Sequence, residues 1–360
     1  MKIPFINYGA SYQRYKKELD DVWFRVNETG KYILQEDNEI FEKTLAQYVG
    51  TKYAVSVGNG TDALVLSLKA AGIHPGDECI TVSNTFKATV TAIKAVGATP
   101  VLVDIGEDYL IDQREVHKAI TPRTKVILPV HLSGDMCDMW ALRQLQEEYD
   151  NQFVIIEDAA QGLGATRDGK MAGSVGLTGC FSFYPAKILG CFGDGGGVTT
   201  DNEEVYKWIK NYANHCKDVQ GEDGTNSRLD NLQAGILNVK FKYLADNLAH
   251  RKMVAEVYDK ELAGIGDIIL PSSRPNRQYQ DYIIRTIYRD KLAQFLKANG
   301  IGTMIPPILP HQELSIGGRL PKSELYNTQY LRLPCNPEIT KEEARAVSEQ
   351  IKYFYDTIML

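Results

Sequence analysis

Short apolar runs alternate with amphipathic segments along most of this chain. Apolar runs of about five residues are typical of buried parallel strands, whereas apolar positions that recur every three or four residues predict helices. The apolar runs predict strands at residues 53–57, 78–82, 99–104, 125–130, 153–157 and 179–183. The helical pattern predicts helices at residues 40–49, 62–71, 87–96, 113–119, 139–149 and 203–213. This alternation predicts an α/β fold with a mainly parallel central sheet and helices on both faces.

Both ends of the chain depart from this alternation. Residues 1–30 predict an extended arm followed by an amphipathic helix, and residues 228–248 predict one long helix that joins two domains. Beyond this helix, the pattern predicts shorter elements, with strands at 282–286 and 303–305 and helices at 291–299 and 341–358. We therefore predict a large domain over residues 1–240, which includes the arm, and a small C-terminal α+β domain over residues 241–360.

Composition narrows the class of protein. The 360 residues are 44% hydrophobic and 24% charged, which is ordinary for a globular enzyme. A net charge of −6 argues against binding to nucleic acid, and no apolar run approaches the length of about 18–20 residues that a membrane-spanning helix needs. Several of the six cysteines lie in apolar runs and none forms a CxxC pair. We therefore expect reduced core cysteines in a cytoplasmic protein, and no metal site.

A single lysine follows the apolar, aromatic strand predicted at residues 179–183. Lys187 lies beyond a proline turn and before the glycine-rich run at 193–197. Desolvation beside an apolar strand would lower the pKa of Lys187 and leave its amine free to attack a carbonyl carbon. The alternative for a single lysine is a solvated side chain on a turn.

Three further stretches favour the chemical interpretation of Lys187. Asp158 ends an apolar run, at the edge of a parallel sheet where ligands bind, and it could hold a pyridine nitrogen protonated. Gly60 and Thr61 lie in a small polar turn that opens a helix, whose free N–H groups suit a phosphate. Phe86 follows another strand and could stack on a ring. A phosphate cradle, a ring platform, an acid and a lysine are the parts that pyridoxal phosphate requires.

Eight stretches, in this order, resemble the DegT/StrS-like nucleotide-sugar aminotransferases, which are fold-type I pyridoxal-phosphate enzymes. The matching stretches are GKYIL (30–34), GNGTDAL (58–64), HPGDECITVSNTFKAT (74–89), GATPVLVDI (97–105), ITPRTKVILPVHLSG (120–134), IIEDAAQGLGA (155–165), FSFYPAKILGCFGDGGGVTT (181–200) and TNSRLDNLQAGIL (225–237). The resemblance implies a fold-type I architecture, pyridoxal 5'-phosphate as cofactor, and amino transfer from L-glutamate to a nucleotide-linked keto sugar. It also implies a homodimer with composite active sites.

The resemblance assigns roles to the residues around the cofactor. Lys187 would form the Schiff base and, once freed, shuttle a proton between the substrate carbon and the cofactor. Asp158 would pair with the pyridine nitrogen, although an aspartate at a strand end can also cap a helix. Phe86 would stack on the ring instead of entering the core, and Gly60 and Thr61 would bind the phosphate.

Three polar residues receive roles from the resemblance alone. Gln161 resembles the residue that hydrogen-bonds the ring hydroxyl of the cofactor, and Ser182 resembles the phosphate-binding serine that lies five positions before the lysine. Asn226 resembles an asparagine that reaches the phosphate in the active site of the partner subunit, so each site would be built from two chains. The alternatives are a solvated glutamine, a serine that satisfies nearby backbone groups and a solvated loop asparagine.

The substrate side of the site departs from the pattern. His131, Arg228 and His311 are candidate substrate-binding residues, and the alternatives are a hydrogen-bonded strand-end histidine, a dimer-interface arginine and a solvated loop histidine. Near residue 305, where many relatives carry His-Tyr-Pro, this chain reads Met-Ile-Pro-Pro at residues 304–307. The ring-bearing side chains of that wall are therefore missing, and we expect an altered sugar site.

Three functions are compatible with these motifs. A transaminase for a nucleotide-linked keto sugar is favoured, in biosynthesis of an amino sugar for a surface polysaccharide or a secondary metabolite. Residues 226–234 are most similar to members that act on 3-keto sugars, with 4-keto sugars as the alternative. Related sugar dehydratases carry histidine at the lysine position, so Lys187 argues against dehydration. A regulator without turnover would not need the lysine, the acid and the phosphate cradle.

Overall fold

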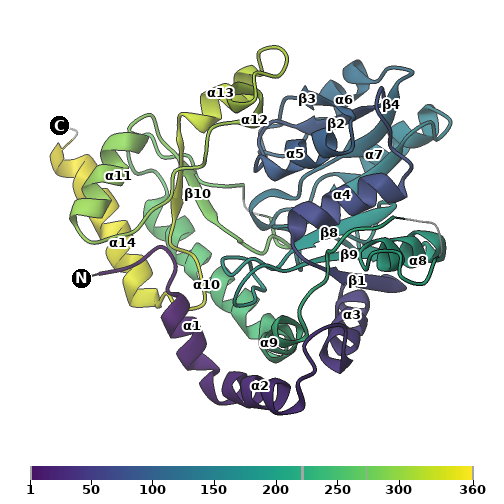
Figure 1. Cartoon of the computed structure of the whole chain (residues 1–360). Coiled ribbons are helices and arrows are strands. Elements are labelled where there is room, and N and C mark those ends of the chain that lie inside the picture. The colour runs from purple at the N-terminus through teal and green to yellow at the C-terminus, as the bar shows by residue number, and fades with distance from the viewer. Residues whose placement is uncertain (1, 220–222, 273, 359–360) are drawn as a thin grey trace.

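The computed structural model describes residues 2–219, 223–272 and 274–358, and its largest element is a seven-stranded sheet (Figure 1). The strands of this sheet are β1 (Tyr53–Val57), β2 (Glu78–Val82), β3 (Thr99–Val103), β4 (Thr124–Leu128), β5 (Val154–Asp158), β8 (Thr178–Ser182) and β9 (Gly196–Thr200). Their order is β1-β9-β8-β5-β4-β2-β3. β9 pairs antiparallel with β1 and β8, and the other neighbours pair in parallel. The sheet is therefore mainly parallel, which confirms the predicted fold class.

Helices pack around this sheet (Figure 1). They are α3 (Glu36–Val49), α4 (Gly60–Ala70), α5 (Ala88–Ala95), α6 (Gln113–Ala119), α7 (Met139–Glu148) and α8 (Glu203–Tyr212), and the loops between them hold the short elements η1 (Leu132–Gly134), β6 (Thr166–Arg167) and β7 (Lys170–Met171). All six predicted helices form. The start of α3 differs most from its prediction, because a capping box between Gln35 and Asn38 begins the helix one turn earlier.

The C-terminal part of the chain has an apolar core of its own. Its elements are α10 (Leu244–Leu262), β10 (Tyr282–Arg285), α11 (Arg289–Ala298), α12 (Pro310–Glu313), α13 (Pro321–Asn327), β11 (Tyr330–Leu333), α14 (Lys341–Tyr353) and η2 (Phe354–Ile358). β10 and β11 pair antiparallel, and α10, α11 and α14 contribute apolar side chains to the core. This core supports our proposal of a small domain after residue 240. It also includes Ile3, which bridges to Ile301, so the first residues of the arm pack with the small domain.

The predicted long helix at residues 228–248 is wrong, because the structure has two helices there. α9 (Asn231–Phe241) packs on the arm helix α2 (Lys16–Thr29), which follows α1 (Tyr8–Arg14), whereas α10 faces the C-terminal core. Tyr243 lies at the break, where its ring stacks on Tyr15 at 4.5 Å between ring centroids and its hydroxyl bonds to Glu18. These contacts with the arm hold the turn that lets the two helices bury their side chains in different cores.

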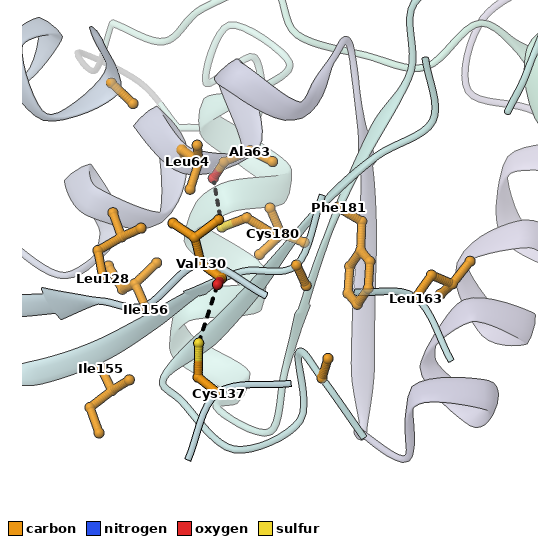
Figure 2. Packing of buried hydrophobic residues seen from close by; sticks show 14 of the residues in the cluster. Ala63, Leu64, Leu128, Val130, Cys137, Ile155, Ile156, Leu163, Cys180 and Phe181 are labelled. Atoms are coloured by element: carbon orange, nitrogen blue, oxygen red, sulfur yellow. Dashed lines mark hydrogen bonds between the residues drawn. The ribbon is translucent and has the colours of Figure 1, made fainter. Parts of the chain in front are cut away.

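Packing between α4 and β8 places the start of α4 beside the end of β8 (Figure 2). Cys180 on β8 donates from its Sγ to the carbonyl of Ala63 on α4 at 3.5 Å, and Cys137 donates to the carbonyl of Val130 at 3.2 Å. All six cysteines are buried, as predicted for core cysteines. Within the described residues, none of the helices combines the length and the apolarity that a bilayer crossing demands.

The sequence pattern does not predict β9, because this strand begins with two glycines. A Cβ on Gly196 would lie 2.3 Å from the carbonyl oxygen of Asn59, and a Cβ on Gly197 would lie 3.0 Å from both Leu45 and Phe183. Close packing therefore excludes side chains at the positions where an apolar signal would have marked a strand. The strand expected at residues 303–305 is reduced to one bridge, between Met304 and Arg332.

Candidate active site

A cavity of about 830 Å³ lies at the carboxyl ends of the parallel strands. Its walls come from three parts of the chain: the loops that follow the strands, the arm with α1, and the C-terminal domain. In open α/β sheets, ligands bind at this edge. The volume also lies within the range of about 300–1,000 Å³ that is typical of small-molecule sites.

The start of α4 and the end of β8 form one wall of the cavity. Asn59 Oδ1 accepts a hydrogen bond from the Asp62 N–H at 2.8 Å and caps α4. The N–H groups of Gly60 and Thr61 make no hydrogen bond among the described residues. A Cβ on Gly60 would lie 2.8 Å from the Cβ of Ser182, so only glycine allows this close approach. Free N–H groups at a helix start, beside a serine hydroxyl, form an anion site.

Asp158 ends β5 and lines the cavity, with its side chain almost fully buried. Thr89 donates to Oδ2 at 2.8 Å, and the N–H of Ala160 donates to Oδ1 at 3.2 Å. Burial raises the pKa of Asp158, while these two hydrogen bonds and the amine of Lys187 oppose the rise. A buried carboxylate that keeps free lone pairs is suited to hold a protonated ring nitrogen.

Lys187 follows β8 after the Tyr-Pro-Ala turn, and its backbone N–H donates to the carbonyl of Tyr184 at 2.9 Å. The side chain lines the cavity, and its Nζ makes no hydrogen bond to the described residues. Burial lowers the pKa of Lys187, and the carboxylates of Asp158 and Asp281 oppose this shift. Loss of the proton is therefore easier than for a solvated lysine, and the uncharged amine is the nucleophilic form.

Three further predicted residues line the same cavity. The side chain of Phe86 is 56% exposed, so its ring is free to stack on a ligand and is not part of the core. Gln161 Oε1 accepts from the N–H of Ser133 at 2.9 Å, which leaves the amide NH₂ of Gln161 for a ligand. Ser182 Oγ accepts a long hydrogen bond of 3.4 Å from the N–H of Tyr184 and can still donate its proton.

His131 and Glu157 form a buried pair away from the cavity. Glu157 precedes Asp158 on β5, so the two carboxylates point to opposite faces of the sheet. The N–H of Cys137 donates to His131 Nδ1 at 3.1 Å, and Nε2 therefore carries the proton that it donates to Glu157 at 2.7 Å. Burial opposes ionisation of Glu157, but the hydrogen bonds that it accepts lower its pKa. With both side chains fully buried, the structure does not place His131 where it could contact a ligand in the cavity.

Three other predicted residues also lie outside this cavity. Asn226 is exposed and forms an isolated bridge with Asn214. Arg228 donates to Asn214 Oδ1 at 3.0 Å and lines a separate pocket of about 190 Å³. His311 is buried and hydrogen-bonds to the hydroxyl of Ser83, so it is neither a solvated loop residue nor a wall of the cavity. Contributions from Asn226 and Arg228 would therefore require a second chain.

The C-terminal domain contributes charged residues to the cavity that sequence reasoning did not single out. Arg332 on β11 and Asp281, just before β10, line it together, with 3.5 Å between Arg332 Nη1 and Asp281 Oδ2. Arg332 interrupts the apolar sequence of β11, and Asp281 directly precedes the apolar sequence of β10. A charge in such a place is the sequence signal that could have identified these two residues. Beside them, Met304, Pro306 and Pro307 form the wall where the Ile-Pro-Pro departure was expected to change the site. These three side chains offer apolar contact, and among them only the thioether of Met304 can accept a hydrogen bond.

The donor set of the cavity fits pyridoxal 5'-phosphate. The helix start at Gly60 and Thr61, with Ser182 opposite, offers donors of the kind that a phosphate group accepts from. Asp158 offers a buried carboxylate for a ring nitrogen, and Lys187 offers an amine with a lowered pKa for an aldehyde. These groups come from three different strand ends but line one cavity.

Comparison with known proteins agrees with this fit. Residues 13–352 match the DegT/DnrJ/EryC1/StrS aminotransferase family. The chain is 38% identical, over 99% of its length and 97% of the relative, to dTDP-3-amino-3,4,6-trideoxy-alpha-D-glucose transaminase of Streptomyces venezuelae. It is 36% identical, over 97% of its length and 82% of the relative, to 3-oxo-glucose-6-phosphate:glutamate aminotransferase of Bacillus subtilis (strain 168).

A solved structure of Streptomyces venezuelae DesV, in complex with ketimine intermediate, shares the fold of this chain. The TM-score is 0.94 at 38% sequence identity, and 99% of each chain is covered. The family match spans nearly the whole chain, and the cofactor of this family, pyridoxal phosphate, is the one that the donor set fits. The chain therefore belongs to the DegT/DnrJ/EryC1/StrS aminotransferase family and is a pyridoxal-phosphate-dependent sugar aminotransferase.

Proposed function

We propose that this enzyme transfers the amino group of L-glutamate to the 3-keto group of a nucleotide-linked sugar. The observation that carries the proposal is that Lys187, Asp158 and the anion site at the start of α4 line one cavity, which also has a wall free for a second reactant. The Streptomyces relative is named for a dTDP-linked 3-amino sugar, and the Bacillus relative for a 3-oxo sugar and glutamate. Both names favour position 3 over position 4.

The proposed roles follow from the positions of the side chains. When bound, the cofactor supplies an electron sink and a temporary carrier for the amino group. Gly60, Thr61 and Ser182 would hold the phosphate, and Asp158 would keep a proton on the ring nitrogen. Lys187 moves a proton to and from the reacting substrate carbon, for which its lowered pKa is suited. Phe86 would stack on the cofactor ring, and Gln161 would hydrogen-bond its ring hydroxyl.

The amino donor can be identified in a single turnover. With glutamate and no sugar, we expect the holoenzyme to form one 2-oxoglutarate per active site and its visible absorbance to shift, because the first half-reaction of a transaminase is complete without the acceptor. Quenched-flow mass spectrometry and stopped-flow absorbance measure the two events. Alanine is the control, since it lacks the second carboxylate. If glutamate forms no 2-oxoglutarate in this experiment, the proposed donor is wrong.

Product analysis tests the sugar half of the proposal. Mass spectrometry of the product from dTDP- and UDP-linked 3-keto and 4-keto sugars is expected to show a gain of nitrogen, with the highest kcat/KM for a 3-keto sugar. A product that has lost water without gaining nitrogen would instead support the dehydratase alternative.

We further propose that the product enters a surface polysaccharide or a secondary metabolite. We also propose that the enzyme is located in the cytoplasm, because its six buried cysteines are reduced thiols, which a reducing compartment maintains.

We also propose a homodimer in which Asn226 of each chain completes the site of its partner. Ser227 anchors this segment, because its hydroxyl donates to Asp62 Oδ2 at 2.7 Å and accepts from the N–H of Gly58 at 3.0 Å. Asn226 itself stays exposed and outside its own cavity. Large apolar side chains on the arm, on α2 and after α2 are exposed, which supports an interface there; they are Tyr8, Trp23, Phe24, Tyr32, Ile33 and Leu34.

A mixture of two inactive variants tests the composite site. In a dimer of one Lys187→Ala chain and one Asn226→Ala chain, one site carries both defects and the other carries neither. Random reassortment should therefore restore about a quarter of wild-type activity, at a cofactor concentration where Asn226→Ala is inactive by itself. Lys187→Ala reassorted with itself is the control. Mixed dimers that form but stay inactive, or an active wild-type monomer by light scattering, would exclude the composite site.

A further inference from the structure

A side chain from the C-terminal domain holds the backbone on both sides of Lys187. We define the lysine loop as residues 183–190, which connect the end of β8 to the glycine-rich run. Gln280 Oε1 accepts from the N–H of Ile188 at 2.8 Å, and Gln280 Nε2 donates to the carbonyl of Ala186 at 2.9 Å. The two ends of one amide therefore bind the two peptide groups that flank Lys187.

This double hydrogen bond matters because the other contacts that hold the lysine loop lie at its ends, where Cys191 donates from its N–H to the carbonyl of Phe183 at 2.9 Å and Lys240 donates to the carbonyl of Gly190 at 2.6 Å. The Nζ of Lys187 makes no hydrogen bond to the described residues, and its side chain reaches into the cavity. Within the lysine loop, its backbone N–H donates to the carbonyl of Tyr184 at 2.9 Å. The direction in which the long side chain leaves the backbone is thus set by the peptide groups that Gln280 holds.

Gln280 is itself anchored in the C-terminal domain. It is 8% exposed and lies two residues before β10, between Tyr279 and Tyr282 of the C-terminal core. Arg251 on α10 donates from Nη1 to the carbonyls of Tyr279 and Gln280, each at 3.2 Å, and to the carbonyl of Cys335 at 2.6 Å. The carbonyl of Gln280 is therefore held by Arg251 on α10, together with the segment after β11, while the nearby Gln278 donates from its N–H to the carbonyl of Gly134 in the large domain at 2.8 Å.

We propose that Gln280 is a positioning residue that couples the placement of Lys187 to the C-terminal domain. The proposal rests on the proposed role of Lys187 in amino transfer. The same domain supplies Arg332 and Asp281 to the cavity. Gln280 therefore ties the backbone on both sides of Lys187 to the part of the chain that supplies these two charges.

The chain offers a matched control in Gln233 on α9. Gln233 Oε1 accepts from the N–H of Phe192 at 2.8 Å, and Gln233 Nε2 donates to the carbonyl of the same residue at 3.3 Å. The chemistry is the same as at Gln280, but the residue that is held lies five positions beyond Lys187. A loss of this contact should loosen the segment after the lysine loop without moving Lys187.

Amide hydrogen exchange on the cofactor-free protein tests the contact directly. We expect Gln280→Ala to speed exchange at Ile188 by about tenfold, because the N–H loses its acceptor. Gln280→Glu keeps an acceptor for Ile188 but cannot donate to Ala186 when ionised, so its effect should be smaller. Gln233→Ala should speed exchange at Phe192 and leave Ile188 as in the wild type. Unchanged exchange at Ile188 in both Gln280 variants would overturn the proposal.

The holoenzyme supplies the functional readout. Gln280→Ala is expected to lower kcat by about 10- to 100-fold, the scale of an ångström-sized misplacement of a reacting group, while the KM for the donor changes less. The pH midpoint of the visible absorbance should shift as well, because the amine that meets the cofactor changes its surroundings. Gln233→Ala should shift neither the midpoint nor the kcat in this way. If Gln280→Ala and Gln233→Ala lose kcat equally, the role of Gln280 is merely structural.

Two further outcomes separate this proposal from others. If Gln280→Ala fails to fold by circular dichroism, the near-isosteric Gln280→Glu decides the question, with loss of kcat supporting the proposal and wild-type kcat overturning it. If Lys187→Ala retains turnover while Ile188 still responds to Gln280→Ala, the proposed function fails, and Gln280 holds a loop that has no part in catalysis.

Discussion

Replacing Lys187 with alanine is expected to lower amino transfer by at least about 10³-fold while the protein keeps its fold. The variant loses both a nucleophile and the group that moves the proton at the substrate carbon, and either loss alone is worth about 10²- to 10⁴-fold. The rate of 2-oxoglutarate formation from glutamate measures the effect. Lys118→Ala is the control, because this lysine is exposed and forms a surface ion pair with Glu115 at 2.8 Å. Turnover above about a tenth of wild type would contradict the assignment of Lys187.

Replacing Lys187 is expected to stabilise the cofactor-free protein, although it removes activity from the holoenzyme. Burial lowers the pKa of Lys187, so the folded state disfavours the charged amine that the unfolded chain carries. Lys187→Met should therefore raise the free energy of unfolding. The sign of the pKa shift sets the pH range: the gain is full below the lowered pKa of the folded state and vanishes above the ordinary lysine value of about 10.4. Urea denaturation between neutral and alkaline pH measures it.

Two adjacent carboxylates on β5 are expected to respond in opposite ways to removal of their charge. Asp158→Asn should lower turnover by about 10²- to 10³-fold, because a neutral amide cannot hold the proton on the ring nitrogen that makes the cofactor an electron sink. Burial raises the pKa of Asp158, so its charge opposes folding of the cofactor-free protein. The substitution should therefore leave stability equal or higher. Any gain in unfolding free energy is full above the raised pKa of Asp158 in the folded state and is lost below the ordinary aspartate pKa of about 3.9.

Glu157→Gln is the matched control for Asp158→Asn. Glu157 accepts from His131 and from the backbone N–H groups of Gly173, Val175 and Gly176, and these bonds lower its pKa despite its burial. An amide NH₂ would face donors there, so we expect a loss of about 3 kcal/mol in unfolding free energy. The stability that Glu157 contributes is present above the ordinary glutamate pKa and is lost as the pH falls.

Denaturation and turnover per folded molecule, measured on both variants, distinguish the two roles. Asp158→Asn should lose activity and keep stability, whereas Glu157→Gln should lose stability and keep most of its activity. If Asp158→Asn retains wild-type turnover, Asp158 does not act on the ring nitrogen. If Glu157→Gln is as stable as the wild type, the buried pair with His131 has no structural importance.

The positions of the main reactive groups could be predicted from the sequence because each depends on a local pattern. Asp158 ends a strand that begins with three apolar residues, and Gly60 and Thr61 open a helix shortly after another strand. Parallel strands end at the same edge of a sheet, so the alternation of strands and helices already brings these groups together. Lys187 follows the same rule through β8.

Other features depend on residues that are distant in the sequence, and local patterns carry no information about them. Gln280 lies 92 and 94 positions from the two groups that it holds, and no motif marks it. His131 is assigned to the substrate by its place at a strand end, yet its pairing with Glu157, 26 positions away, keeps it buried. His311 is read as a loop residue, but Ser83 holds it 228 positions away.

The break between α9 and α10 and the strand β9 have the same physical origin. Helical periodicity continues through residues 228–248, so the turn at Tyr243 arises from contacts with Tyr15 and Glu18 in the arm. The glycines of β9 carry no apolar signal, because the backbone of Asn59 occupies the space of a side chain at Gly196 and the side chains of Leu45 and Phe183 crowd that space at Gly197. Periodicity along the chain therefore predicts which segments become strands and helices and which groups end them. Where helices break, which polar groups are buried and what holds the lysine follow from packing between segments far apart in the chain.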